Sequence, residues 1–264
     1  MNYGICLWSS VAVRAHHSHA SEMITQLLFG ETYSVTDQCE EWIAICTSDC
    51  HYAGWISCKQ HQELSSEEYA QYQELDKYRV NDVFLFIRDA ITHIGFPLFL
   101  GAQFPMPVQG TFTIANRTFK VELPERNELP HHDGLTAQQE QLLDTAFRFL
   151  NAPYLWGGRT ITGIDCSGFV QSVFRSIGIQ LPRDASQQVD LGEVVNFAEE
   201  AQIGDLCFFE NTEGKIVHTG LVCGYQQIIH SSGHVQINTL DNTGIYNHEL
   251  KRYTHQLRVI KRVL

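Results

Sequence analysis

The chain lacks any long hydrophobic run, and none approaches the roughly 20 apolar residues that a membrane-spanning helix needs. Its first residues have neither the basic start nor the apolar core of a secretory signal peptide, and no lipidation motif is present. Positive charge is also scarce, with 18 Lys and Arg against 30 Asp and Glu and a formal net charge of −12. This balance argues against nucleic acid and against anionic membranes as main partners.

The cysteines lack the regular spacing of a disulfide framework. They stand at positions 6, 39, 46, 50, 58, 166, 207 and 223. The group Cys46-x3-Cys50-His51 could suggest zinc, but it has no Cys-x2-Cys pair and lies in a segment that we expect to fold without metal. We therefore predict reduced thiols, no metal and a cytoplasmic location.

A chain of 264 residues, 44% of them hydrophobic, can bury more than one core, so two or three domains are expected. Residues 1–62 carry short β signals separated by turns. These are Ile24–Phe29, Tyr33–Val35, Trp42–Ile45 and Gly54–Ile56. Residues 63–79 form a polar connector that is predicted to be helical over Ser65–Tyr78.

A second set of β signals occupies residues 80–124, followed by a polar linker at 125–135. The expected strands are Val83–Ile87, Pro97–Leu100, Thr111–Ile114 and Thr118–Val121. Residues 136–264 form the last predicted domain, which opens on a capping-box pattern at Thr136 and Gln139. Because its helical patterns precede apolar strands, we predict an α+β domain with an antiparallel sheet.

The segment Asp165-Cys166-Ser167-Gly168 follows the glycine-rich turn Trp156-Gly157-Gly158 and opens an apolar helical pattern. Cys166 thus falls in the first turn of a helix, where unpaired N–H groups favour a thiolate. His218 and His230 follow downstream, in the order of a Cys–His nucleophile with a third, orienting group. A buried structural thiol is the alternative, but it does not explain the flanking glycines and both histidines.

Several blocks together resemble the NlpC-type cysteine peptidases, which cleave peptides of bacterial peptidoglycan. The blocks are Pro153-Tyr154-Leu155-Trp156-Gly157-Gly158, Asp165-Cys166-Ser167-Gly168, Leu181-Pro182-Arg183-Asp184, Gly204-Asp205-Leu206, His218-Thr219-Gly220 and His230. The resemblance implies a papain-like α+β catalytic domain without a cofactor. It also implies Cys166 as nucleophile, His218 as general base, His230 as orienting residue and Tyr154 as part of the oxyanion hole.

Residues 1–62 resemble a bacterial SH3-like domain, and residues 80–124 resemble a second, divergent one. Barrels before such a catalytic domain resemble the γ-D-glutamyl-L-diamino acid endopeptidases of muropeptide recycling. That resemblance implies a small murein peptide substrate, L-Ala-γ-D-Glu-diamino acid, whose free amine is selected by the first barrel. The implied substrate-binding residues are Glu22, Tyr52, Asp165, Ser167 and Ser186, with Trp156 as a wall of the pocket or a core residue.

Other interpretations remain open at this point. The protein could be a secreted hydrolase of intact cell wall, a non-catalytic wall-binding module, or an amidase or acyltransferase on the same fold. Arg159 and Arg183 could hold an acidic ligand or form salt bridges. His93, His234 and His255 have no motif around them and receive no predicted role. The diamino acid, the protein partners and the oligomeric state are not indicated by the sequence.

Overall fold

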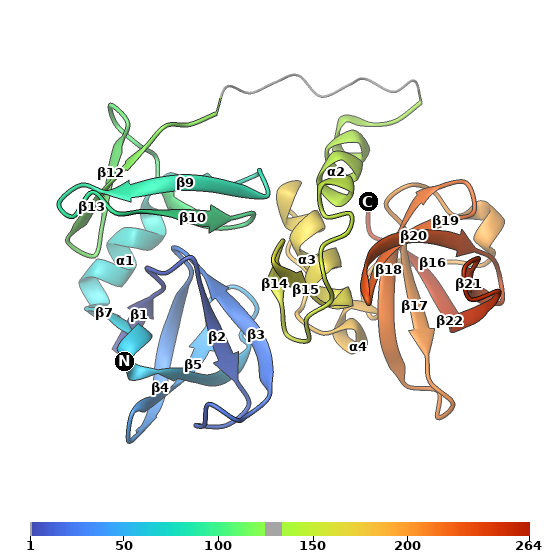
Figure 1. The fold of residues 1–264 in the computed structure, drawn as a ribbon, viewed down its shortest axis with the longest axis horizontal. Coiled ribbons are helices and arrows are strands. Elements are labelled where there is room, and N and C mark those ends of the chain that lie inside the picture. The colour runs from blue at the N-terminus through green and yellow to red at the C-terminus, as the bar shows by residue number, and fades with distance from the viewer. Residues whose placement is uncertain (1, 125–133) are drawn as a thin grey trace. The chain divides into compact units, whose positions relative to one another are not determined.

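The computed structural model describes residues 2–124 and 134–264, which form parts of two compact units, 1–127 and 128–264 (Figure 1). Most of the predicted linker, 125–135, lies outside the described residues. No helix among the described residues has the length and apolar character needed to cross a membrane. All eight cysteines are described, and none forms a disulfide bond.

The first unit begins with a seven-stranded antiparallel sheet in the order β3-β2-β6-β5-β4-β1-β7. The strands are β1 (Asn2–Ile5), β2 (Ser10–Arg14), β3 (Met23–Leu28), β4 (Thr32–Cys39), β5 (Trp42–Thr47), β6 (Ala53–Ser57) and β7 (Gln62–Leu64). Alternate apolar side chains of these strands, including Val11, Val13, Ile45 and Ile56, bury one core. The four strands predicted in this region are confirmed, and β1, β2 and β7 add to them.

The remainder of the first unit combines further strands with one helix, which is shorter than predicted for Ser65–Tyr78 because Lys77–Arg79 forms a strand. It contains α1 (Ser66–Glu74), β8 (Lys77–Arg79), β9 (Phe84–Asp89), β10 (Gly95–Phe99), β11 (Gln103–Pro105), β12 (Thr111–Ile114) and β13 (Arg117–Val121). Strands β10-β9-β13-β12 form an antiparallel sheet, and β11 pairs with β8. Phe29, directly after β3, packs edge-on against Phe112 and Phe119. Both parts of the unit therefore share a core; the second SH3-like barrel expected at 80–124 stays a prediction.

The second unit has its helices first and its main sheet afterwards, as predicted. The helical part holds α2 (Ala137–Arg148), β14 (Arg159–Thr160), β15 (Gly163–Ile164), α3 (Cys166–Ser176) and α4 (Ala185–Gln188). The sheet holds β16 (Glu193–Val195), β17 (Leu206–Glu210), β18 (Ile216–Gly224), β19 (Gln227–Ser232), β20 (His234–Leu240), β21 (Gly244–Asn247) and β22 (Arg252–Arg262). The capping box predicted at Thr136 and Gln139 is present at the start of α2.

Six of these strands close into a barrel, drawn in orange and red in Figure 1. Their order is β22-β17-β18-β19-β20-β21, and β21 pairs again with β22. Helix α3 packs against β18 and β19. This contact brings the first turn of α3 to the strands that carry His218 and His230, so the closed barrel and the helix build the site together.

Candidate active site

Cys166 is the first residue of α3, and its backbone is fixed by the residue before it. Asp165 is the N-cap, and its carboxylate accepts a hydrogen bond of 2.7 Å from the N–H of Gly168. Every residue of α3 is buried, and Gly178, just beyond the end of the helix, has a φ of +84° that favours glycine. The thiol of Cys166 is 6% exposed. The sequence therefore places Cys166 as predicted, in a helical first turn.

A buried ion pair holds this first turn in place. Arg183 donates to the carboxylate of Asp165 at 2.6 and 3.1 Å and to Oγ of Ser167 at 2.9 Å. The side chains of the ion pair are only 2% and 7% exposed. The Asp165 carboxylate also accepts from the N–H of Gly157 at 2.8 Å. Of the two possibilities left open for Arg183, the structure thus contains the salt bridge, which joins three separate segments around Cys166.

The glycine-rich turn lies directly against α3 because Gly168 of the helix lacks a side chain. A Cβ on Gly168 would lie 2.4 Å from the carbonyl oxygen of Gly158, closer than real Cβ atoms approach. The turn follows Tyr154, whose backbone N–H donates to the Gly233 carbonyl at 2.9 Å. Burial, with Cys166 and Asp165 nearby, raises the pKa of the Tyr154 phenol to about 12. The phenol therefore stays protonated at neutral pH and can donate a hydrogen bond.

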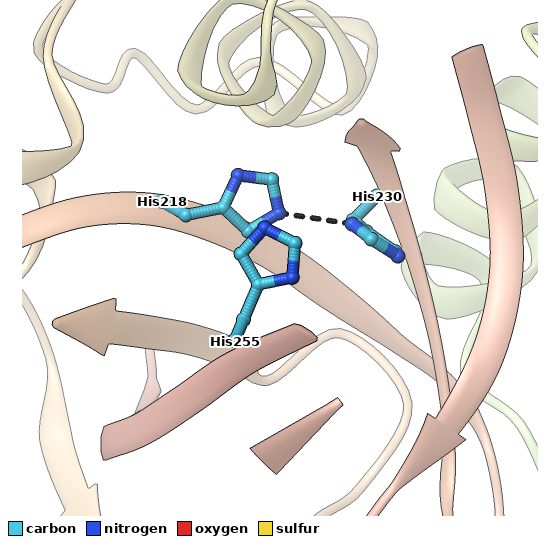
Figure 2. Close-up of side chains that lie close together, drawn as sticks. All are labelled: His218, His230 and His255. Atoms are coloured by element: carbon cyan, nitrogen blue, oxygen red, sulfur yellow. Dashed lines mark hydrogen bonds between the residues drawn. The ribbon is translucent and has the colours of Figure 1, made fainter. Parts of the chain in front are cut away.

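His218 and His230 are joined by a hydrogen bond (Figure 2), and the hydrogen-bonded chain continues to Asn238. Nε2 of His218 lies 2.9 Å from Nδ1 of His230, and Nε2 of His230 lies 3.0 Å from Oδ1 of Asn238. The three residues come from the neighbouring strands β18, β19 and β20. Gly220 leaves space for this arrangement, since a Cβ there would lie 2.8 Å from Cβ of His230.

The chain fixes the tautomer of both imidazoles. Oδ1 of Asn238 can only accept, so Nε2 of His230 donates to it. A neutral His230 then accepts at Nδ1 from the Nε2–H of His218. The lone pair of His218 is therefore left on Nδ1. A histidine held in this way can act as a base toward a proton donor on its Nδ1 side.

Burial decides the charges of these groups. It lowers the pKa of His218 well below 6.5, with His230 and His255 acting in the same direction, and it lowers the pKa of His230 to about 4. Burial, followed by the charge of Asp165, raises the pKa of the Cys166 thiol to about 11, although the N–H groups of Thr219 and Ser167 act in the opposite direction. Burial thus opposes the resting thiolate that the helix N-terminus favours, and the directions of these pKa shifts favour a neutral thiol beside a neutral imidazole.

Comparison with known proteins decides the family. The model of the NlpC/P60 family matches residues 151–254, and that of the bacterial dipeptidyl-peptidase Sh3 domain matches 13–60. The gamma-D-glutamyl-L-lysine dipeptidyl-peptidase of Bacillus subtilis (strain 168) is 30% identical over 238 residues, covering 86% of this chain and 78% of the relative. The chain belongs to the NlpC/P60 family. It is therefore a peptidase with an SH3-like N-terminal region.

Two further similarities support this membership. The protein of the same name from Bacillus cereus (strain ATCC 10987) is 27% identical over 237 residues, covering 81% of this chain and 68% of the relative. A crystal structure of an NlpC/P60 family protein from Bacillus cereus ATCC 10987 superposes with a TM-score of 0.81 at 19% identity, covering 99% of both chains. That structure shares the fold of the whole chain, including the SH3-like region.

The other predicted site residues of this NlpC/P60 protein differ in how the structure places them. Ser186 is exposed on α4, and Gln188 of the same helix donates to the Ser167 carbonyl at 3.1 Å, which ties α4 to the first turn of α3. The Trp156 side chain is 58% exposed. Glu22 is exposed just before β3, and Tyr52 is half-buried before β6. Both belong to the first unit, and their place in the site stays a prediction.

Sequence reasoning missed two residues at this site, Asn238 and His255. Asn238 follows Gln236, the β-pairing partner of His230, by two residues and is therefore a diagonal neighbour of His230 on the same face. His255 on β22 stacks on His218, with ring centroids 4.1 Å apart and an angle of 24° (Figure 2). Neither residue has a local motif: Asn238 is placed by the register of the β19–β20 hairpin, and His255 by the pairing of β22 with strands distant in sequence.

The three histidines do not form a metal site as they stand. Ring nitrogens of His218, His230 and His255 lie within 4.8 Å of one another. However, His218 and His230 direct their nitrogens at each other in a hydrogen bond, and the rings of His218 and His255 are nearly parallel. Lone pairs lie in the ring planes, so those of two stacked rings do not converge on one ion. We assign no metal to this cluster.

Proposed function

We propose that this protein is a cysteine peptidase that hydrolyses the γ-D-glutamyl–diamino acid bond of peptidoglycan-derived peptides with a free N-terminal L-alanine. The products are L-Ala-γ-D-Glu and a peptide or amino acid that begins with meso-diaminopimelate or L-lysine. The observation that carries the proposal is the placement of Cys166 on α3 beside the strand of the His218–His230–Asn238 chain. The similarity to a gamma-D-glutamyl-L-lysine dipeptidyl-peptidase supports the bond specificity.

The neutral state of the pair defines the proposed mechanism. Nδ1 of His218 takes the thiol proton of Cys166 as the sulfur attacks the γ-D-glutamyl carbonyl carbon. The N–H of Cys166 and the Tyr154 hydroxyl donate to the developing oxyanion. His218 then returns the proton to the departing amine, which leaves a thioester on Cys166. Water, deprotonated by His218, hydrolyses the thioester and restores the thiol.

His230 is the proposed orienting residue of this mechanism. Its Nδ1 accepts from Nε2 of His218 at 2.9 Å, and the hydrogen bond to Asn238 fixes the ring of His230 in turn. His218 becomes an imidazolium during the reaction, and its Nε2–H bond to His230 strengthens as it does. His230 thus contributes through the base and not through contact with the substrate.

Substrate selection is assigned to residues of both units. Glu22 and Tyr52 bind the ammonium of L-alanine, Ser167 and Ser186 hold polar groups of the peptide, and Trp156 forms a wall of the pocket. The carboxylate of Asp165 carries several hydrogen bonds from Arg183, Gly157 and Gly168. These bonds fill most of its acceptor sites, so we propose Glu22 as the main hydrogen-bond partner of the ammonium and Asp165 as a contributor of negative charge.

Comparing two peptides tests this assignment. L-Ala-γ-D-Glu-diamino acid is offered with a free and with an acetylated N-terminus, and kcat/KM is measured for each. A charge-assisted hydrogen bond contributes about 1.5–3 kcal/mol, so acetylation should lower kcat/KM by roughly 10- to 100-fold. Glu22→Gln and Tyr52→Ala should narrow this difference, whereas Glu67→Gln, an exposed glutamate on α1, should leave it unchanged.

Each outcome separates the proposal from its alternatives. Equal rates on the two peptides would mean that the enzyme acts on intact wall, where L-alanine is amide-linked. Hydrolysis of neither peptide, with Cys166 inert to thiol reagents, would favour a wall-binding module. Free muropeptides are found in the cytoplasm during recycling, and we propose that compartment for this protein because its eight cysteines form no disulfide bond.

A further inference from the structure

His255 covers one face of the His218 imidazole. The two rings are stacked at 4.1 Å, and the ring of His230 stands nearly perpendicular to both, at 86° to His218 and 81° to His255. Phe209 contacts the edges of His218 and His255, with centroids 5.7 and 5.9 Å away. The hydrogen bond to His230 fixes the direction of Nε2 but leaves rotation about that bond free. The stacked ring of His255 removes this remaining freedom.

A β-bulge directs His255 toward the interior of the barrel. In the pairing of β21 with β22, Ile245 lies opposite His255 and Tyr246 lies opposite Tyr253, so Thr254 is the extra residue. In a regular strand, Tyr253 and His255 would lie on the same face because they are two residues apart. With the bulge they lie on different faces, and Tyr253 is exposed and donates a hydrogen bond to Asp241. Gly244 completes the arrangement, since a Cβ there would lie 1.8 Å from the His255 carbonyl oxygen. The backbone at His255 is thus specified by its neighbours.

His255 is hydrogen-bonded to its neighbour Thr254, and burial favours the neutral form of its ring. Nδ1 lies 2.9 Å from Oγ1 of Thr254, whose hydroxyl donates to the Ile245 carbonyl at 3.4 Å. Because that hydroxyl proton is used, Thr254 accepts from the Nδ1–H of His255. Burial lowers the pKa of His255, so the neutral form prevails at neutral pH. The face that His255 presents to His218 is therefore that of a neutral aromatic ring.

We propose that His255 is a positioning residue for the reaction, which stacks on the general base and keeps its Nδ1 directed at Cys166. A neutral π-face beside His218 also attracts the positive charge that His218 acquires when it takes the thiol proton. Both effects act in the transition state more than in substrate binding, so they should appear in kcat. The proposal rests on the role given above to Cys166 and His218, but not on the identity of the peptide.

The other titratable groups that face or lie near His218 come from segments other than the strand that carries His255. His230 faces His218 from β19, and Cys166 approaches from α3 with Asp165 and Arg183 behind it; His234 acts on His230. None of these groups lies on β22. A change confined to His255 therefore leaves the His218–His230–Asn238 chain and the Asp165–Arg183 ion pair intact.

Two substitutions with opposite chemistry test the proposal in the full chain. His255→Phe retains the stacked ring but loses the hydrogen bond to Thr254, whereas His255→Gln retains a polar group but loses the ring. We expect His255→Phe to keep kcat within about 3-fold of wild type and His255→Gln to lose roughly 10- to 30-fold in kcat with KM changed less than about 2-fold. His248→Gln, an exposed histidine of the same unit, should change neither constant.

A substrate-independent readout keeps this test separate from the proposed specificity. Alkylation of Cys166 by iodoacetamide at pH 7, followed by mass spectrometry of the Cys166 peptide, should slow in His255→Gln and recover in His255→Phe. Equal rates in all variants, equal loss in both folded His255 variants, or an active Gln with an inactive Phe variant would overturn the proposal.

Discussion

The buried Asp165–Arg183 ion pair allows a quantitative prediction for Arg183→Met. Methionine fills a similar volume but removes three hydrogen bonds, two to Asp165 and one to Ser167. The Asp165 carboxylate, 7% exposed, would keep only its bonds from backbone N–H groups and Ser167. Removing one partner of a buried ion pair costs about 3–5 kcal/mol, because the remaining charge stays buried without compensation. We therefore expect Arg183→Met to lower the free energy of unfolding of the second unit by this amount.

The assay must report the second unit alone, since the chain has two units. Native-state hydrogen exchange of peptides from α3 gives the free energy of opening that segment. Asp165→Asn retains a good N-cap and removes the buried charge. The double variant with Arg183→Met should therefore lose less free energy of opening than the two single variants together, by about 2–3 kcal/mol. Losses below about 1 kcal/mol for Arg183→Met, or strict additivity, would refute the reasoning. Lys59→Met, an exposed ion-pair partner in the first unit, serves as control and should change α3 exchange negligibly.

The remaining predictions concern the histidines. The pKa of His230 is about 4 in the folded protein against 6.5 for an ordinary histidine, so only the unfolded chain binds a proton there between these values. The contribution of His230 to the stability of the second unit should be complete above pH 6.5 and should fall by about 3 kcal/mol as the pH falls from 6.5 to 4. Comparing α3 exchange in wild type and His230→Gln separates this contribution from that of His218, and equal pH slopes in the two proteins would contradict it. His218→Ala should reduce kcat as much as loss of Cys166, whereas His230→Ala should retain measurable turnover, since it loosens the base without removing it. Full kcat in either folded variant would remove that residue from the mechanism.

Local patterns in the sequence predict the parts of the site that lie within single elements. The cap and apolar face of α3, the glycine-rich turn and the positions of His218 and His230 on strands all follow from nearby residues. The helix N-terminus that favours a Cys166 thiolate is visible in the sequence, whereas the burial that raises the pKa of the thiol depends on the packing of α3 against β18 and β19.

Closure of the barrel and the role of its last strand required the structure. Strand β22, Arg252–Arg262, is rich in charged residues and carries bulges in its pairings with β17 and β21, so no regular alternation marks it as a strand. His255 reaches His218 only through that closure. The long-range pairing of β22 leaves no short-range pattern, which explains why His255 was missed. Asn238 lies in the short β19–β20 hairpin but has no motif around it that indicates a role.

Hydrolysis of L-Ala-γ-D-Glu-diamino acid by wild type and Cys166→Ala is the most direct test of the proposed mechanism. Release of L-Ala-γ-D-Glu is followed by mass spectrometry, with Cys39→Ala, a half-buried thiol of the first unit, as the matched control. We expect wild type and Cys39→Ala to release the dipeptide at equal rates and Cys166→Ala to release none while its α3 exchange stays protected. Measurable release by a folded Cys166→Ala variant would contradict the mechanism.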